Sequence, residues 1–571
     1  MIPVPPNTKY PRTRRPASEP KADAPKGEVA ELFPGKSAGS SSGKKEILLG
    51  QDVDRVVDEC EALIAQDVGI YQRDGQLVRV THTAESEADA KTLMGTPQIR
   101  ALQPATLTEH LTRLASFVRF DGRAKRWVPA MPSGAIVAAL GARGQWRNVR
   151  PLAGITEAPS MRPDGTIVQT PGLYDPVTRF LFMPNEVFPL IADHPTQDEA
   201  REALRQLREP FADFPFATEA DASAVLAGVL TLLARPAIEG SVPAFLNDAT
   251  TPGTGKTLVT DVTSMIGTGR PTSKMGYPAN DEELSKVLGA YAIRGASLIN
   301  FDNISRAFGG APIDRCLTAC GAVEQRVLGK SELPSLSWTA VMTGSGNNLE
   351  VQGDTGRRVL VSRLETKLEN PEERTGFRHH PLLPWVAAQR PRLVHAALTI
   401  LRAYVVAGRP SQGLREWGSF EKWSTLIASA LVFAGASDPM GARASGDGVV
   451  NTEKVSYVVL LRGLKRLDEG GGMTAKEVIA RLYPPQDRAQ GPQPPDGNDD
   501  MREAVETLTE ARTGRTPEVS ALSYVLRRLR GRILGGGIKL VRADEGSRLA
   551  RWRVEDVRDE QHYRDDSDNS Q

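Results

Sequence analysis

The segment at residues 244–257, Ala-Phe-Leu-Asn-Asp-Ala-Thr-Thr-Pro-Gly-Thr-Gly-Lys-Thr, constrains the fold of this chain more than any other. A short apolar run leads into a Pro-Gly turn and Gly-Lys-Thr, and residues 258–266 then have helical character. In a strand–loop–helix unit of this kind, backbone N–H groups point at a phosphate and the helix N-terminus adds its positive dipole end. The full phosphate-loop pattern begins with Gly, and this chain has Thr250 there. The segment predicts an α/β fold built on a parallel sheet.

The residue types in the loop predict ATP and Mg²⁺ as cofactors. Lys256 is expected to reach the β- and γ-phosphates, and the Thr257 hydroxyl to hold Mg²⁺. The expected nucleotide contacts are Pro252, Gly253, Thr254, Gly255, Lys256, Thr257 and Leu258.

Length and charge narrow the class of protein. A chain of 571 residues is too long for one core, so several domains are expected. The net charge of +1 means that a nucleic-acid partner must be met by local basic patches. Three cysteines provide neither a disulfide framework nor a zinc set, and no apolar run is long enough to span a bilayer. We therefore expect a cytoplasmic protein with no membrane partner.

Composition shifts along the chain predict its domain boundaries. The expected order is a disordered tail at 1–46, a mixed α+β domain at 47–190, the phosphate-loop core at 191–370, a helical region at 371–454, a small C-terminal domain at 455–554 with an internal loop at 484–500, and an acidic tail at 555–571.

A nucleoside triphosphatase also needs an acid for Mg²⁺ and a group that orients water. Residues 297–303, Ser-Leu-Ile-Asn-Phe-Asp-Asn, form an apolar strand that ends in Asp302, the expected Walker B acid and second metal ligand. A strand-end Asp that only begins a turn is the alternative. The next position, commonly a Glu, is Asn303, which can orient water but cannot take its proton. Asp302 then shares that task, or another acid such as Glu324 supplies it.

Two further pairs follow down the chain. Residues 337–348 form a strand that ends in Asn347 and Asn348, either of which suits a sensor of the γ-phosphate; an Asn-capped turn is the alternative. Arg357 and Arg358 come soon after and are placed to act as an arginine finger on a neighbour's nucleotide. A finger acting in trans requires an oligomeric ring; a surface salt-bridge pair does not.

Residues 325–338 are predicted to form a strand, a tight turn and a strand. In a ring this hairpin would point into the pore, where Arg326 and Lys330 could grip the phosphates of single-stranded DNA. A solvated hairpin without DNA contact is the alternative.

The C-terminal domain resembles a winged helix. Helices are predicted at 474–482 and 520–530, and strands at 537–542 and 550–554. A basic helix and wing would suit duplex DNA, whereas a protein-binding wing would leave the arginines solvated. The residues expected on DNA are Arg527, Arg528, Arg530 and Lys539.

The order of these motifs resembles a known family. Asn347 lies only 91 positions after Lys256, and this compactness resembles superfamily 3 helicases of the AAA+ class, including the helicase part of phage primase-helicases. The segments at 298–303, 343–349, 354–358 and 369–374 are similar to helicase-like ATPases of prophages and integrative elements. The resemblance implies an AAA+ core in a hexameric ring that binds Mg-ATP between subunits and translocates on DNA. Thr250 and Asn303 depart from the family pattern.

The expected function is therefore an ATP-dependent DNA helicase or translocase in the replication of a phage or mobile element, with a separate primase or polymerase as a possible partner. A helicase loader or origin-binding initiator that uses ATP as a switch is the first alternative, and Asn303 favours it. A primase-helicase is the second, although residues 47–190 contain no convincing pair of metal-binding acids.

Overall fold

The computed structural model describes residues 44–82, 95–251, 253–324, 334–366, 368, 370–443, 452–484, 497–509, 511, 515–534, 537–543 and 550–556. The N-terminal tail predicted to be disordered, the acidic C-terminal tail and most of the predicted internal loop at 484–500 lie outside these residues.

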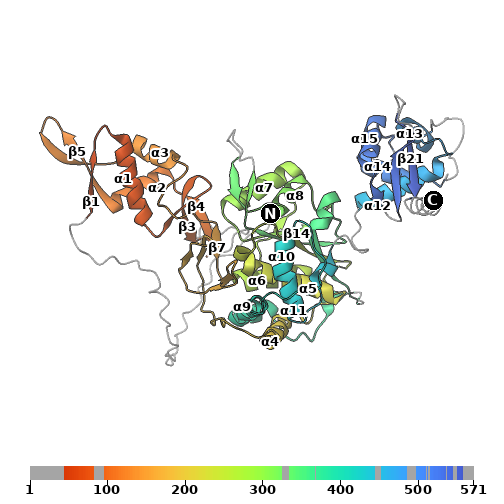
Figure 1. Ribbon diagram of the computed structural model, residues 1–571, viewed down its shortest axis with the longest axis horizontal. Helices are drawn as coiled ribbons and strands as arrows, with labels where there is room; N and C mark the ends of the chain where they lie inside the picture. The colour runs from red at the N-terminus through yellow and green to blue at the C-terminus, as the bar shows by residue number, and fades with distance from the viewer. Residues whose placement is uncertain are drawn as a thin grey trace, which may run out of the picture.

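The centre of the protein is a five-stranded parallel sheet, as predicted (Figure 1). Its strand order is β13-β14-β17-β12-β18, so β17 lies between β12 and β14. Because parallel strands point the same way, their carboxyl ends meet at one edge of the sheet. The strands are β12 (Ala244–Ala249), β13 (Met275–Gly276), β14 (Leu298–Ile304), β17 (Val341–Asn347) and β18 (Val359–Leu364).

Helices cover both faces of this sheet, because successive side chains of a buried strand point to opposite sides. Phe245 of β12 packs into one core cluster and its neighbour Leu246 into the other. The first cluster is built with α4 (Gln197–Arg208), α5 (Glu219–Ala234), α6 (Lys256–Thr268), α9 (Leu382–Val406) and α11 (Ser429–Phe433), and the second with α7 (Asp281–Ile293) and α8 (Ala311–Leu317).

The sequence predicts several of these helices because their signals are local. Thr196 and Glu199 form a reciprocal capping box at the start of α4, and Thr218 and Asp221 form another at α5. The helical region predicted at 371–454 contains α9 and, further along, α10 (Glu421–Trp423), a π-helical turn (Ser424–Ala428) and α11. Short 3-10 turns occupy Glu209–Phe211, Arg235–Ala237, Gly353–Arg358, Pro371–Glu373 and Pro439–Ala442.

The expectation that no apolar run is long enough to span a bilayer was wrong on length and composition alone, because within the described residues one helical stretch, Glu219–Ala237, is long and apolar enough. Its most apolar window is 72% buried inside the protein.

The N-terminal region is mixed α and β. Three helices and one three-stranded sheet share a core: α1 (Val53–Gln66), α2 (Pro104–Leu114), α3 (Gly134–Ala142), β1 (Lys45–Leu49), β5 (Ala115–Asp121) and β6 (Arg126–Ala130). The remaining strands are β2 (Ile70–Arg73), β3 (Gln76–His82), β4 (Pro97–Ala101), β7 (Gly154–Thr156), β8 (Ser160–Met161), β9 (Ile167–Val168), β10 (Tyr174–Asp175) and β11 (Phe180–Phe182).

One buried cation ties this region to the central core. The Arg73 side chain is 2% exposed, and its guanidinium donates to the carbonyls of Ala292 at 3.1 Å and Ser337 at 3.0 Å. Ser337 belongs to the antiparallel ribbon of β15 (Ala322–Glu324) and β16 (Ser335–Ser337). β16 lies within the hairpin predicted at 325–338, whereas β15 ends just before it, and residues 325–333 lie outside the described residues.

The C-terminal unit has a core of its own, drawn from residues 457–554. The predicted helices at 474–482 and 520–530 and both predicted strands are confirmed, whereas α12, α14 and β19 were not predicted. The elements are α12 (Thr452–Leu467), α13 (Ala475–Leu482), α14 (Asp499–Thr509), α15 (Val519–Leu529), β19 (Ile533–Leu534), β20 (Ile538–Arg542) and β21 (Trp552–Asp556), and the strands pair antiparallel in that order.

Candidate functional site

The loop between β12 and α6 lies at the carboxyl edge of the sheet and needs glycine at two positions. Gly253 has φ +79° and Gly255 has φ +92°, where side chains are strained. A Cβ at position 255 would also lie 2.9 Å from a ring carbon of Phe214, and one at 253 would lie 2.6 Å from Glu372 Oε2. The two glycines therefore allow both the left-handed backbone of the loop and the close approach of Phe214 and Glu372. Pro252, one of the expected contacts, lies outside the described residues.

The structure brings the Thr257 hydroxyl and the Asp302 carboxylate together. Thr257 Oγ1 donates to Asp302 Oδ1 at 3.1 Å, although the two residues are 45 positions apart. Ser345 of β17 donates its hydroxyl to the same oxygen at 2.7 Å. A hydroxyl and a carboxylate at this separation are hard oxygen donors of the kind that Mg²⁺ takes together with nucleotide phosphates and water. The residues present therefore fit the predicted metal.

Lys256 is the first residue of α6 and lies between two carboxylates. Burial lowers the pKa of its ammonium below the usual value, and the negative charges of Asp248 and Asp302 oppose that shift. Asp248 is itself held in place, since its Oδ1 accepts from the backbone N–H of Leu349 at 2.9 Å. A half-buried cation at a helix N-terminus is an electrostatic site for an anion.

Asn303 and Asn348 share a backbone feature that the sequence does not show. Their φ values are +52° and +49°, in the left-handed region that Asn tolerates better than most residues. Both side chains are exposed. Asn347, by contrast, is the last residue of β17 and pairs in register with Ala249, next to the loop. Backbone conformation accounts for Asn at 303 and 348, but not at 347.

The two arginines of the predicted finger differ in their contacts. Arg357 has a side chain 61% exposed and one ion pair, with Asp354 at 2.8 Å. Arg358 is 13% exposed and is bound by Asp314 at 2.5 Å and Asp354 at 3.2 Å. Arg358 is therefore neutralised within its own chain, whereas Arg357 is open to solvent. Glu324 lies exposed on the β15–β16 ribbon, apart from the five-stranded sheet.

A cavity of about 470 Å³ opens beside the loop, lined by Gly253, Thr254, Gly255 and Leu258. Its other walls come from the segments before β12 and after β18, and they supply aromatic and imidazole rings. These rings are Phe214, Phe377, His379 and His380.

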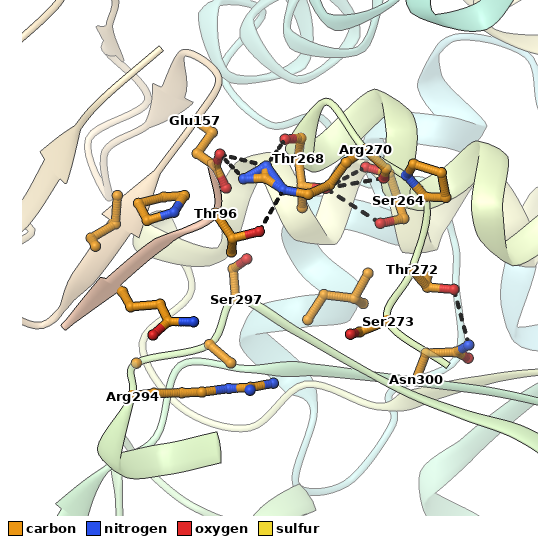
Figure 2. Close-up of a pocket in the computed structure, with 17 residues that line it drawn as sticks. Thr96, Glu157, Ser264, Thr268, Arg270, Thr272, Ser273, Arg294, Ser297 and Asn300 are labelled. Atoms are coloured by element: carbon orange, nitrogen blue, oxygen red, sulfur yellow. Dashed lines mark hydrogen bonds and ion pairs between the residues drawn. The ribbon is translucent and has the colours of Figure 1, made fainter. Parts of the chain in front are cut away.

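A second cavity, of about 100 Å³, lies at the other end of α6 (Figure 2). The helix has 13 residues, so the two ends are about 20 Å apart. Here the carboxylate of Glu157 forms an ion pair with Arg270, whose Nε donates to Thr96 Oγ1 at 3.1 Å. Burial raises the pKa of the Glu157 carboxyl to about 7, although Arg270 and Arg390 act in the opposite direction.

The four predicted DNA contacts of the C-terminal unit lie at or beyond the last turn of α15. Arg527, Arg528 and Arg530 are exposed, and Lys539 is half-buried on β20. Arg528 donates to the Tyr457 hydroxyl and lies over its ring at 5.6 Å. Arg326 and Lys330 lie outside the described residues, so their predicted role in a pore stays a prediction.

Sequence reasoning missed Asp248, Ser345 and the cavity rings. The signal for Asp248 was a polar Asn-Asp pair inside a strand otherwise apolar, directly before the loop. The signal for Ser345 was its place in the Thr-Gly-Ser-Gly-Asn stretch at the end of β17. No signal was available for the cavity, because its walls come from segments more than 150 residues apart.

The chain matches no protein-family model and no curated protein. Among solved structures, it is similar to the A-form apo C-terminal region of NrS-1, with a TM-score of 0.32 and 11% identity over 80% of this chain and 99% of that chain. It is also similar to SCCmec type IV Cch, described as an active helicase, with a TM-score of 0.28 and 12% identity over 86% of this chain and 98% of that one. Likenesses at this level assign no activity to this chain.

Proposed function

We propose that the chain is an ATPase whose phosphate site is the loop before α6. The observation that carries this proposal is the 3.1 Å contact between Thr257 and Asp302, beside Lys256. The loop N–H groups and Lys256 bind the phosphates, while Thr257 and Asp302 hold Mg²⁺. Bound Mg²⁺ would neutralise charge that develops on the phosphate oxygens.

The aromatic cavity beside the loop is proposed to take the base and ribose. It shares Gly253, Thr254 and Gly255 with the phosphate site, so a nucleotide can occupy both. Apolar and ring-lined walls with a few polar groups are typical of small-molecule sites. Adenine would stack on rings such as Phe214 or Phe377.

Asn347 is proposed as the residue that senses the γ-phosphate and orients water. It ends β17, between the strand of the loop and the strand of Asp302. The left-handed backbone at Asn348 is reason enough for an Asn there, whereas no such backbone requirement exists at Asn347. A role for the side-chain amide is therefore the better explanation for Asn347. Asp302 is the acid at this edge that shares the task of polarising water.

The five-stranded core is proposed to be of the AAA+ type and to assemble into a hexameric ring. Arg357 would then reach the nucleotide of a neighbouring subunit. Its exposure and single ion pair support this choice, because Arg358 is already bound by two carboxylates. An arginine supplied in trans contributes on the order of 10³–10⁵ in rate.

The work of the ATPase is proposed to be DNA translocation and unwinding in the replication of a phage or mobile element. The C-terminal unit, with its helices and a three-stranded antiparallel sheet, is proposed to be a winged helix. Its arginines cluster at the C-terminal end of α15, whereas base-reading helices use their N-terminal residues. This placement supports phosphate contacts rather than sequence readout.

The test is steady-state ATP hydrolysis with and without single-stranded DNA, with Lys256→Ala as the blank. Loss of a charge-stabilising donor should cost about 10²–10³ in turnover. Strong stimulation by DNA that disappears in the variant supports a translocating helicase. Turnover of Lys256→Ala within twofold of the parent would remove the loop from the mechanism.

A helicase loader or initiator switched by ATP is the second candidate, and Asn303 favours it. The position after Asp302 carries an amide, in a left-handed conformation that disfavours a longer acid. Slow hydrolysis that ignores DNA, together with ATP-dependent oligomerisation, would select this candidate.

A further inference from the structure

The β5–β6 hairpin projects beyond the sheet to which it belongs. β1 pairs with β5 only as far as Leu49 and Arg119, while β5 and β6 stay paired out to Asp121 and Arg126. Residues 120–127 therefore form a free two-stranded ribbon, at the upper left of Figure 1. A short ribbon outside a core contributes little to the stability of the fold. Stability alone therefore does not explain which side chains the ribbon carries.

Two large aromatic side chains of this ribbon are exposed to solvent. Phe120 and Trp127 are directly opposite in register, with ring centroids 5.6 Å apart and an edge-to-face angle of 67°. A cross-strand aromatic pair stabilises a hairpin by up to about 1 kcal/mol, which is the purely structural reading. Yet Phe120 stays 54% and Trp127 47% exposed, so ring surface remains free to stack on a ligand.

Four cations lie on the ribbon near the rings, although the alternation of side chains along a strand puts Arg119 and Arg126 on the opposite face from the two rings. Arg119, Arg123, Lys125 and Arg126 are all exposed, and no ion pair joins the last three to an acid within the described part of the chain. The one carboxylate of the ribbon, Asp121, accepts from the backbone N–H groups of Arg123 at 2.9 Å and Ala124 at 3.1 Å and so holds the turn. The ribbon therefore presents excess positive charge near two open rings.

We propose that the β5–β6 hairpin binds a single-stranded nucleic acid, with bases stacked on Phe120 and Trp127 and phosphates on the nearby cations. Ring stacking combined with backbone cations is how proteins hold single strands without reading sequence, and every base offers a ring face. Paired bases of a duplex are stacked on each other and are not free to do this. DNA and RNA strands share this chemistry. The site is additional to the pore and C-terminal contacts proposed above, and needs neither ATP nor hydrolysis.

An anionic membrane surface would also attract cations and aromatic rings, but the order of residues along the ribbon does not suit insertion into a membrane. The turn at its end, residues 121–125, is polar and carries Arg123 and Lys125, while the rings lie one residue pair further back. A membrane-inserting tip would lead with apolar residues, because charges enter hydrocarbon at high cost.

The test uses the full-length chain without nucleotide and single strands of about 16 nucleotides, of DNA or of RNA, that carry photoreactive 5-iodouracil. Irradiation followed by peptide mapping should place crosslinks within residues 115–130. Phe120→Ala/Trp127→Ala should lose these crosslinks and weaken binding by about 5–150-fold, the equivalent of 1–3 kcal/mol for a stacked base. Trp127→Phe keeps an aromatic ring and should retain most of the crosslinking and most of the binding affinity.

Two control variants distinguish base stacking on the rings from electrostatic attraction of the phosphates. Arg123→Ala/Lys125→Ala/Arg126→Ala should reduce the salt dependence of binding by about 0.7 in logarithmic slope for each phosphate that the hairpin no longer neutralises. Val187→Ala/Leu190→Ala removes two apolar side chains elsewhere that are even more exposed than the rings, and it should change neither the crosslinks nor the affinity. Basal ATP hydrolysis should be unchanged in the hairpin variants. This result would show that the variants fold and that the hairpin site is separate from the ATPase site.

Crosslinks to the hairpin from either nucleic acid support the proposal, and a preference between the two identifies the strand. Crosslinks only elsewhere in the chain would overturn it. Hairpin-dependent flotation with anionic vesicles, without crosslinks, would also overturn it in favour of a lipid surface.

Discussion

Replacing Thr257 with Val tests whether the Thr257–Asp302 contact serves folding or metal binding. Valine has nearly the same shape and removes the hydroxyl that donates to Asp302 at 3.1 Å. A hydrogen bond to a charged group contributes about 1.5–3 kcal/mol, and the lower part of that range applies here because Asp302 is only half-buried. Without nucleotide, we therefore expect a decrease of about 1.5 kcal/mol in the free energy of unfolding.

Ser345→Ala is the matched control, because it removes the other side-chain hydrogen bond to the same carboxylate oxygen, at 2.7 Å. Its effect on unfolding should be of similar size. Its effect on hydrolysis should be smaller, since Ser345 orients Asp302 but is not proposed to bind the metal. Chemical denaturation without ligand measures the first effect for both variants.

The two variants should diverge once Mg-ATP is added. Thr257→Val should lower turnover by about 10²–10³, the scale for removing one interaction made in the transition state, and raise the Mg²⁺ concentration for half-maximal rate. Thr257→Ser, which keeps the hydroxyl, should restore most of the rate. Equal decreases in turnover for Thr257→Val and Ser345→Ala, with no change in Mg²⁺ dependence, would refute a direct role for Thr257 in metal binding.

Three further predictions concern other residues of the structure. Arg357→Ala should abolish most turnover yet regain activity when mixed with Lys256→Ala subunits, whereas Arg358→Ala should chiefly lower thermal stability; no recovery in any mixture would argue against a trans finger. Because burial raises the pKa of Glu157 from 4.5 to about 7, protonation stabilises the folded state below about pH 4.5, and this contribution is lost as the pH rises to about 7. Glu157→Gln should therefore gain on the order of 3 kcal/mol relative to the parent between pH 4.5 and 8, measured by denaturation at each pH, and a constant difference would contradict the raised pKa. Asn303→Ala should cost about 1 kcal/mol in unfolding free energy and Asn303→Gly much less, because of the left-handed backbone; equal effects would point to a side-chain role instead.

Local signals account for the parts of the fold that the sequence predicted. Short apolar runs predicted β12 and β14, and the caps at Thr196 and Thr218 are visible as residue patterns three positions apart. The helix α14 was missed because it follows a Pro- and Gly-rich stretch that favours a loop, and burial of Met501 and Val505 in the C-terminal core outweighs that local preference.

The sequence by itself determined the glycine-containing loop after β12, the helix that follows it and the strand that contains Asp302, because each depends on neighbours within a few residues. Only the tertiary structure decided which side chains meet there. Ser345 reaches Asp302 because β17 lies beside β14, and Asp248 holds the turn after Asn347 because β12 lies on the other side of β17. Strand order is set by long-range packing on both faces of the sheet, so contacts between residues 43 and 101 positions apart leave no periodic trace in the chain.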